Sequence, residues 1–163
     1  MRVVFQRVWR GNSAPNLPQP EAASEVASHL LKECRMVLPG IQALFGFQLI
    51  AVFNNKFGEM PEAHQTLHLL ATVFVTISIA FVMTPAAYHR QAHQFAISRT
   101  FVQLSSLLLL LSMILLSVGI CLDVYVVCAL ITGSDAISLM VALAAALLFT
   151  LLWFVFPRCI RNP

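Results

Sequence analysis

Four long apolar segments separated by short polar stretches set the pattern of this chain. They lie at about residues 36–53, 63–84, 101–131 and 136–156. The third segment carries a single charged residue, Asp123, and as a helix it would be roughly 46 Å long, whereas the hydrocarbon core of a bilayer is about 30 Å thick. The pattern therefore predicts an all-α, polytopic membrane protein with four transmembrane helices in an antiparallel bundle.

A polar arm, residues 1–32, precedes this predicted transmembrane domain, residues 33–157, and a short tail, residues 158–163, follows it. Residues 1–10 place arginines opposite aromatic and aliphatic side chains if they are helical, which is typical of an amphipathic helix at an anionic membrane surface. We expect a linker and a juxtamembrane helix to complete the arm. An acid-free start that bears arginine also fits an organellar transit peptide, and this alternative stays open.

The distribution of basic residues predicts the orientation. Nine of the ten Lys and Arg residues lie before the first apolar segment, in the loop at residues 85–99 or in the tail, and only Lys56 lies in the opposite loops. By the positive-inside rule, both termini are cytoplasmic. With only 10% charged residues, the chain lacks the basic surface of a nucleic-acid-binding protein, so the expected partner is the lipid bilayer.

The one acid of the third segment ends a polar stripe. Ser105, Ser112, Gly119 and Asp123 fall within about 40° of one another on a helical wheel. If the helix continues past Asp123, this carboxylate is an intramembrane acid, which by default indicates proton or cation coupling. If the span ends near Leu122, Asp123 caps the outer end instead. Segment lengths leave both alternatives open.

Two amide side chains lie in the first segment. Gln42 shares a helix face with Gly46, whereas Gln48 points about 120° away from that face. Amides at such depth form hydrogen bonds between helices or, less often, line a solvated path. The candidate ion or proton path comprises Asp123, Ser112, Ser105, Gln42 and Gln48.

Small and hydroxyl residues spaced by four predict ridges that pack against neighbouring helices, with a polar lining as the alternative. The ridge of the second segment is His64, His68, Thr72, Thr76, Ala80 and Thr84. The ridge of the fourth segment is Ser138, Ala142, Ala146 and Thr150.

Metal and enzyme chemistry are not indicated. The histidine pairs His64/His68 and His89/His93 lack further Cys or carboxylate ligands at a motif spacing, so we expect no metal site. The four cysteines form no CxxC pair. Because no Ser/His pair, HExxH motif or paired acids occur at usable spacing, we expect neither an enzyme nor a cofactor.

Two sequence runs carry a resemblance. ECRMVLPGIQALFGFQL at residues 33–49 and TPAAYHR at residues 84–90 resemble a bacterial family of small four-helix membrane proteins of unknown function. Some of its members carry a transferred label of sodium/proton antiporter. The resemblance implies a four-helix fold and a location in the bacterial inner membrane.

The same two runs suggest a clamp at the cytoplasmic boundary, where one enters the first span and the other leaves the second. The residues of this predicted clamp are Glu33, Arg35, Tyr88, His89 and Arg90, with an ion pair between Glu33 and Arg90. A gating or proton-sensing role is the alternative for His89.

These observations predict a small proton or monovalent-cation transport protein that acts as a homo-oligomer. The alternative is a non-transporting accessory or scaffold subunit that packs against a membrane-protein partner.

Overall fold

The computed structural model describes residues 19–91 and 99–160. The predicted amphipathic helix at residues 1–10, His93 and residues 161–163 of the tail lie outside the described residues, as does the side chain of His89.

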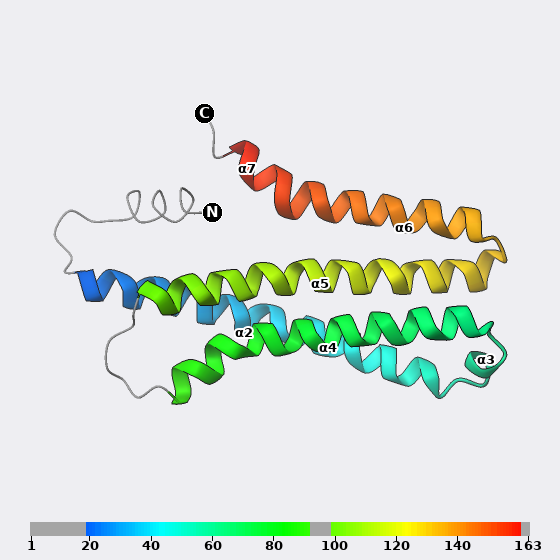
Figure 1. Cartoon of the computed structure of the whole chain (residues 1–163), viewed down its shortest axis with the longest axis horizontal. Coiled ribbons are helices and arrows are strands. Elements are labelled where there is room, and N and C mark those ends of the chain that lie inside the picture. Colours follow the sequence, from blue (N-terminus) through cyan, green and yellow to red (C-terminus); the bar gives the residue numbers. More distant parts are fainter. Residues whose placement is uncertain (1–18, 92–98, 161–163) are drawn as a thin grey trace.

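The described residues are helical and contain no strand. Their elements are α2 (Gln19–Val52), α3 (Asn55–Gly58), α4 (Glu62–Gln91), α5 (Arg99–Thr132), α6 (Asp135–Thr150), the π-helical turn η1 (Leu151–Val155) and α7 (Phe156–Ile160) (Figure 1). Stretches long and apolar enough to cross a membrane cover Ser28–Val52, Glu62–Tyr88, Phe101–Thr132 and Asp135–Cys159. The prediction of an all-helical chain with four such helices is confirmed.

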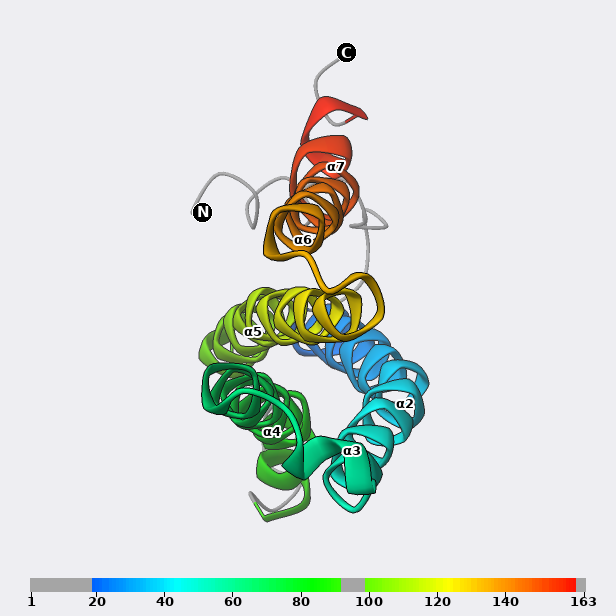
Figure 2. The same cartoon turned by 90° about the vertical axis from the view of Figure 1, so that its right-hand side faces the viewer.

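The four long helices lie along the longest axis of the molecule, and α3 lies at the same end as the turn between α5 and α6, which we call the α3 end (Figure 1). Figure 2 shows α5 between α6 on one side and α2 and α4 on the other. Helix α4 packs mainly on α5, and α2 packs across both. The core therefore lies among α2, α4 and α5.

The interface between α4 and α5 follows a spacing of three and four residues, as in a coiled coil. The buried residues of α4 include His68, Ala71, Val75, Ser78, Val82 and Pro85, and those of α5 include Ser105, Ser112, Leu116, Gly119 and Val126. A Cβ atom at Gly119 would lie 2.9 Å from Val75 Cγ2 and 3.1 Å from the Ala71 carbonyl oxygen. The two helices thus approach each other closely at a position where α5 has no side chain.

The predicted ridge on α4 is correct only near the α3 end. His68 is buried, but Thr76, Ala80 and Thr84 are exposed. A step of four residues turns about 40° further than one helical turn, so a ridge with this spacing rotates away from a straight interface. The exposed Thr76 and Thr84 hydroxyls donate to carbonyl oxygens four residues earlier on their own helix, at 2.8 Å.

The corresponding ridge of α6 packs against α5 at its first members. Ser138 and Ala142 are buried, Ala146 is half-buried and Thr150 is exposed. The rest of α6 exposes large apolar side chains, among them Leu139, Met140, Leu143 and Leu147. Such a surface favours contact with lipid or with another apolar helix.

The turn between α5 and α6 depends on Gly133. Its φ is +62°, and its N–H donates to the Ala129 carbonyl oxygen at 2.9 Å. We expect Gly133→Ala to lower the free energy of unfolding by about 1 kcal/mol, because a Cβ atom is strained in the left-handed region. The measurement is unfolding of the detergent-solubilised protein by sodium dodecyl sulfate, followed by circular dichroism. Gly58→Ala is the control, since that site has open space and its φ lies outside this region. Equal losses in both variants would contradict the expectation.

Candidate functional site

Asp123 lies within a continuous helix. Helix α5 does not end near Leu122 but runs on to Thr132, nine residues or about 14 Å beyond Asp123. The carboxylate is on the side of α5 that faces α2 and α4, and the Asp123 side chain is only 16% exposed. The continuous helix excludes an outer hairpin at residues 123–132, whereas the depth of Asp123 in a membrane stays a prediction.

Three helices bring together Asp123, Gln48 and His68. The Gln48 side-chain Nε2 donates to Asp123 Oδ2, and His68 Nδ1 lies 2.9 Å from Asp123 Oδ1. His68 Nε2 lies 3.0 Å from the main-chain oxygen of Gln48. Gln48 is 3% exposed and the His68 side chain is 10% exposed, so these two members of the cluster are buried and Asp123 is half-buried.

The hydrogen bonds determine how many protons the Asp123–His68 pair holds. The main-chain oxygen of Gln48 can only accept, so His68 Nε2 carries a hydrogen. The contact between His68 Nδ1 and Asp123 Oδ1 then needs one more proton, which lies on the imidazole as His⁺ or on the carboxyl group as neutral Asp. In either form the two side chains share one proton and are neutral together.

A cavity of about 420 Å³ adjoins the cluster. It is lined by Leu44, Phe47, Gln48, Ala51, Asn54, Phe57, Met60, His68, Asp123, Val126, Val127 and Leu130. The ring of Phe57, from α3, packs edge-on against His68 with centroids 5.5 Å apart. Among the described residues, buried Gln48 Oε1 has no hydrogen-bond partner. One acceptor of the cluster is thus unsatisfied beside a cavity whose lining is mostly apolar.

A second pair of titratable side chains lies nearer the α3 end. His64 Nε2 is 3.7 Å from Asp135 Oδ1, and the Tyr125 hydroxyl donates to the same oxygen at 3.2 Å. The Asp135 side chain is 78% exposed, whereas that of His64 is 16% exposed. Because His64 and His68 are one turn apart on α4, polar groups lead from an exposed carboxylate towards the buried cluster.

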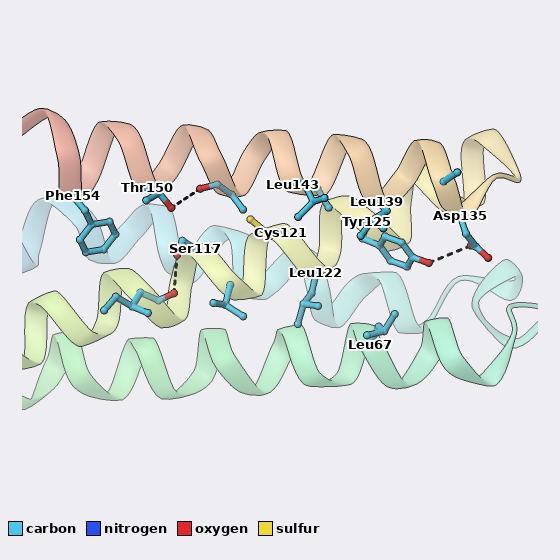
Figure 3. A pocket seen from close by; sticks show the side chains of 15 residues that line it. Leu67, Ser117, Cys121, Leu122, Tyr125, Asp135, Leu139, Leu143, Thr150 and Phe154 are labelled. Carbon is cyan, nitrogen blue, oxygen red and sulfur yellow. Dashed lines mark hydrogen bonds between the residues drawn. The ribbon is translucent and has the colours of Figure 1, made fainter.

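Figure 3 shows a larger cavity, of about 730 Å³, lined mainly by α5 and α6. Tyr125 and Asp135 lie at its α3 end. The hydroxyls of Ser117 and Thr150 donate to carbonyl oxygens of their own helices, at 2.8 Å each. Most of the remaining lining is apolar, so this cavity offers less polar chemistry than the smaller one.

The other predicted path residues lie away from the cluster. Ser105 and Ser112 are buried in the α4–α5 interface, where Ser78 Oγ donates to the Ser112 carbonyl oxygen at 2.9 Å and Ser112 Oγ donates to Leu109 O at 2.7 Å. Gln42 is exposed on α2. A path through these residues stays a prediction, whereas Gln48 and Asp123 are in direct contact.

The predicted ion pair of the clamp is not formed. Glu33 and Arg90 are both exposed and make no ion pair with each other, because Cys34 rather than Glu33 faces the core at this end of α2. Arg35 is also exposed. Tyr88 instead stacks on Phe101 of α5, with ring centroids 5.1 Å apart.

Sequence reasoning missed His68 as the partner of Asp123. The available signal was depth: His68 lies six residues after the start of α4, and Asp123 lies nine residues before the end of α5. Consecutive helices that cross a membrane would bring such positions to similar levels. Among the described residues, no group of three or more His, Cys, Asp or Glu side chains could hold a metal ion.

The fold and site define an all-helical protein with four apolar helices of membrane-spanning length and a buried Asp–His–Gln cluster among three of them. The chain belongs to DUF6328, a family of unknown function whose model matches residues 20–157. This match includes Gln48, His68 and Asp123. No curated protein and no solved structure matches the chain.

Proposed function

We propose that this protein is a multi-pass membrane protein that transports protons, and that Asp123 and His68 form the pair that takes up and releases them. The observation that carries the proposal is the 2.9 Å contact of His68 Nδ1 with Asp123 Oδ1, which lies inside the longest apolar helix and from which we infer a shared proton. Burial of an ionisable pair in such a helix costs stability, which by default marks the pair as a functional site. Loss of this proton leaves one negative charge on the pair, and uptake of a second proton leaves one positive charge, so either step changes the charge of the site.

The surroundings of the pair support access from the α3 end. Asp135 is exposed there, and His64 with Tyr125 lies between Asp135 and the level of His68. The positive-inside rule places this end outside and both termini in the cytoplasm. Together with the resemblance to bacterial proteins, this orientation suggests a bacterial inner membrane protein with an antiparallel helix bundle.

The packing of α4 against α5, on the side of Asp123 that lies away from the α3 end, supports a homo-oligomer. Gly119 meets Val75 and Ala71 closely, and Ser78 bonds to Ser112, so side chains fill the α4–α5 interface towards the opposite end. A proton that crosses the membrane therefore does not follow the α4–α5 interface, and we propose that its route lies between chains. In a variant of this proposal, the transported ion is a monovalent cation, and the Asp123 carboxylate binds it directly.

The exposed face of α6 favours a second candidate, an accessory or scaffold subunit. None of the residues in the most apolar part of this span is buried in the isolated chain. In this alternative, α6 packs against a larger membrane protein and the Asp123 cluster only holds α2, α4 and α5 together.

Proton flux in proteoliposomes tests the proposal. We expect the wild-type protein to dissipate an imposed pH gradient and Asp123→Asn, at matched incorporation, to reduce the flux to that of protein-free vesicles. Glu33→Gln is the control, because it also removes one carboxylate but from an exposed site. Undiminished flux in Asp123→Asn would contradict a role of this pair. Absence of flux from the wild type, with a working positive control, would favour the scaffold and direct the search to partners retained in mild detergent.

A further inference from the structure

The cluster beside this cavity leaves one buried acceptor without a donor among the described residues. Gln48 Nε2 and His68 Nδ1 both face Asp123, and His68 Nε2 faces the Gln48 main-chain oxygen. Gln48 Oε1 is left buried without a partner among the described residues, although Gln48 lines the cavity. A ligand that suits this end must therefore donate a hydrogen bond.

The walls of the cavity restrict the ligand further. Eight of its twelve lining residues are apolar, and two of these are phenylalanines. An alkali ion needs several oxygens in place of its water shell, whereas most of these walls present only carbon atoms. An organic cation fits better, since apolar walls and aromatic rings accept its body while a carboxylate accepts its charge.

We propose that this cavity binds a lipophilic primary amine in its ammonium form, in exchange for the proton of the Asp123–His68 pair. The inference rests on the proposed function, because it uses the same shared proton. The ammonium N–H groups donate to Asp123 and to Gln48 Oε1. The proton of the pair leaves to water, and His68 becomes neutral and keeps its Nε2 hydrogen on the Gln48 main-chain oxygen.

The exchange preserves the charge of the site, since one positive charge replaces another. The groups that face His68 are few. Asp123 faces it from α5, uncharged Gln48 from α2 and Phe57 from α3. One turn away on α4, His64 lies near Asp135 and Tyr125. No described cation other than these histidines lies in this group to compete for Asp123.

The test is calorimetric titration of the purified full-length protein in a neutral detergent with phenethylammonium. Two buffers with different ionisation enthalpies give the number of protons released, and detergent alone is titrated as a blank. We expect one proton released for each amine bound. Affinity in Asp123→Asn should fall at least about tenfold, as expected for loss of a charge-assisted hydrogen bond, and proton release should cease.

Gln48→Leu and Gln42→Leu form a matched pair on α2. The wild type should prefer phenethylammonium over its N,N,N-trimethyl analogue, which has no N–H to donate to Gln48 Oε1. Gln48→Leu should lose this preference, whereas Gln42→Leu should keep it, since Gln42 does not line the cavity. Circular dichroism and the Tm of each variant establish that it is folded.

Several outcomes would overturn the inference. The first is equal affinity for uncharged 2-phenylethanol, which would show that the cavity selects only for apolar ligands. The second is unchanged amine binding in Asp123→Asn. The third is amine binding to the wild type without proton release. Proton release is measured on the wild type, so this outcome can be tested even if Asp123→Asn does not fold. Proton flux without amine binding would contradict this inference alone. Amine binding with proton release but without flux would contradict only the transport proposal.

Discussion

Gly119→Leu is expected to lower the free energy of unfolding by about 3 kcal/mol. Even a Cβ atom at this position would lie 2.9 Å from Val75 Cγ2 and 3.1 Å from the Ala71 carbonyl oxygen. A side chain can rotate away, but a main-chain oxygen moves only with its helix, so α4 and α5 must separate. Because Asp123 lies one turn further along α5, the same shift would break its contact with His68. Titration with sodium dodecyl sulfate, followed by circular dichroism, measures the loss.

Gly40→Leu is the matched control for this prediction. Gly40 is exposed on α2 and has nothing within 4 Å of a built Cβ atom. Leucine is the better helix former by up to about 1 kcal/mol, so this variant should be as stable as the wild type or more stable. If Gly119→Leu behaved like Gly40→Leu, the close approach of α4 and α5 would not occur in the folded protein.

His68→Leu should destabilise the protein by roughly 3 kcal/mol, as when one partner of a buried ion pair is removed. Asp123 would keep only the Gln48 amide as a partner and would have to take up a proton or separate the helices. The double variant His68→Leu/Asp123→Leu removes both members, so it should be more stable than His68→Leu alone. The unfolding free energies of the wild type, His68→Leu, Asp123→Leu and the double variant form a double-mutant cycle.

A coupling energy near zero in that cycle would show that Asp123 and His68 do not act as a pair. The same variants can be assayed in proteoliposomes. There His68→Leu should lose proton flux as Asp123→Asn does, because each removes one of the two groups that share the proton. Flux that survives in His68→Leu would assign proton transfer to Asp123 without the imidazole.

The helices themselves could be predicted from the sequence, since their length and apolar composition are local properties. The third segment was expected at residues 101–131, and the apolar stretch of α5 is Phe101–Thr132. The common face of Ser105, Ser112 and Gly119 was also predictable, because one helical period relates them, and all three are buried. The ridge on α4 was predicted less well. Residues four apart share a face over one or two turns but not over five.

The prediction of an ion pair between Glu33 and Arg90 was wrong for a related reason. Two segments that enter and leave a membrane at the same level need not present their charged side chains to each other. The rotation of α2 points Cys34 into the core and leaves Glu33 exposed. A boundary position predicts the depth of a side chain but not its direction.

The sequence by itself determined that the chain forms four long apolar helices, because in an apolar solvent a helix is the structure that satisfies its own backbone hydrogen bonds. It also singled out Asp123 as the one acid within an apolar segment. The tertiary structure decided what Asp123 contacts: His68 is 55 residues away along the chain and Gln48 is 75 away. Such contacts depend on the rotation and offset of each helix against its neighbours, which are set by packing across all the interfaces together.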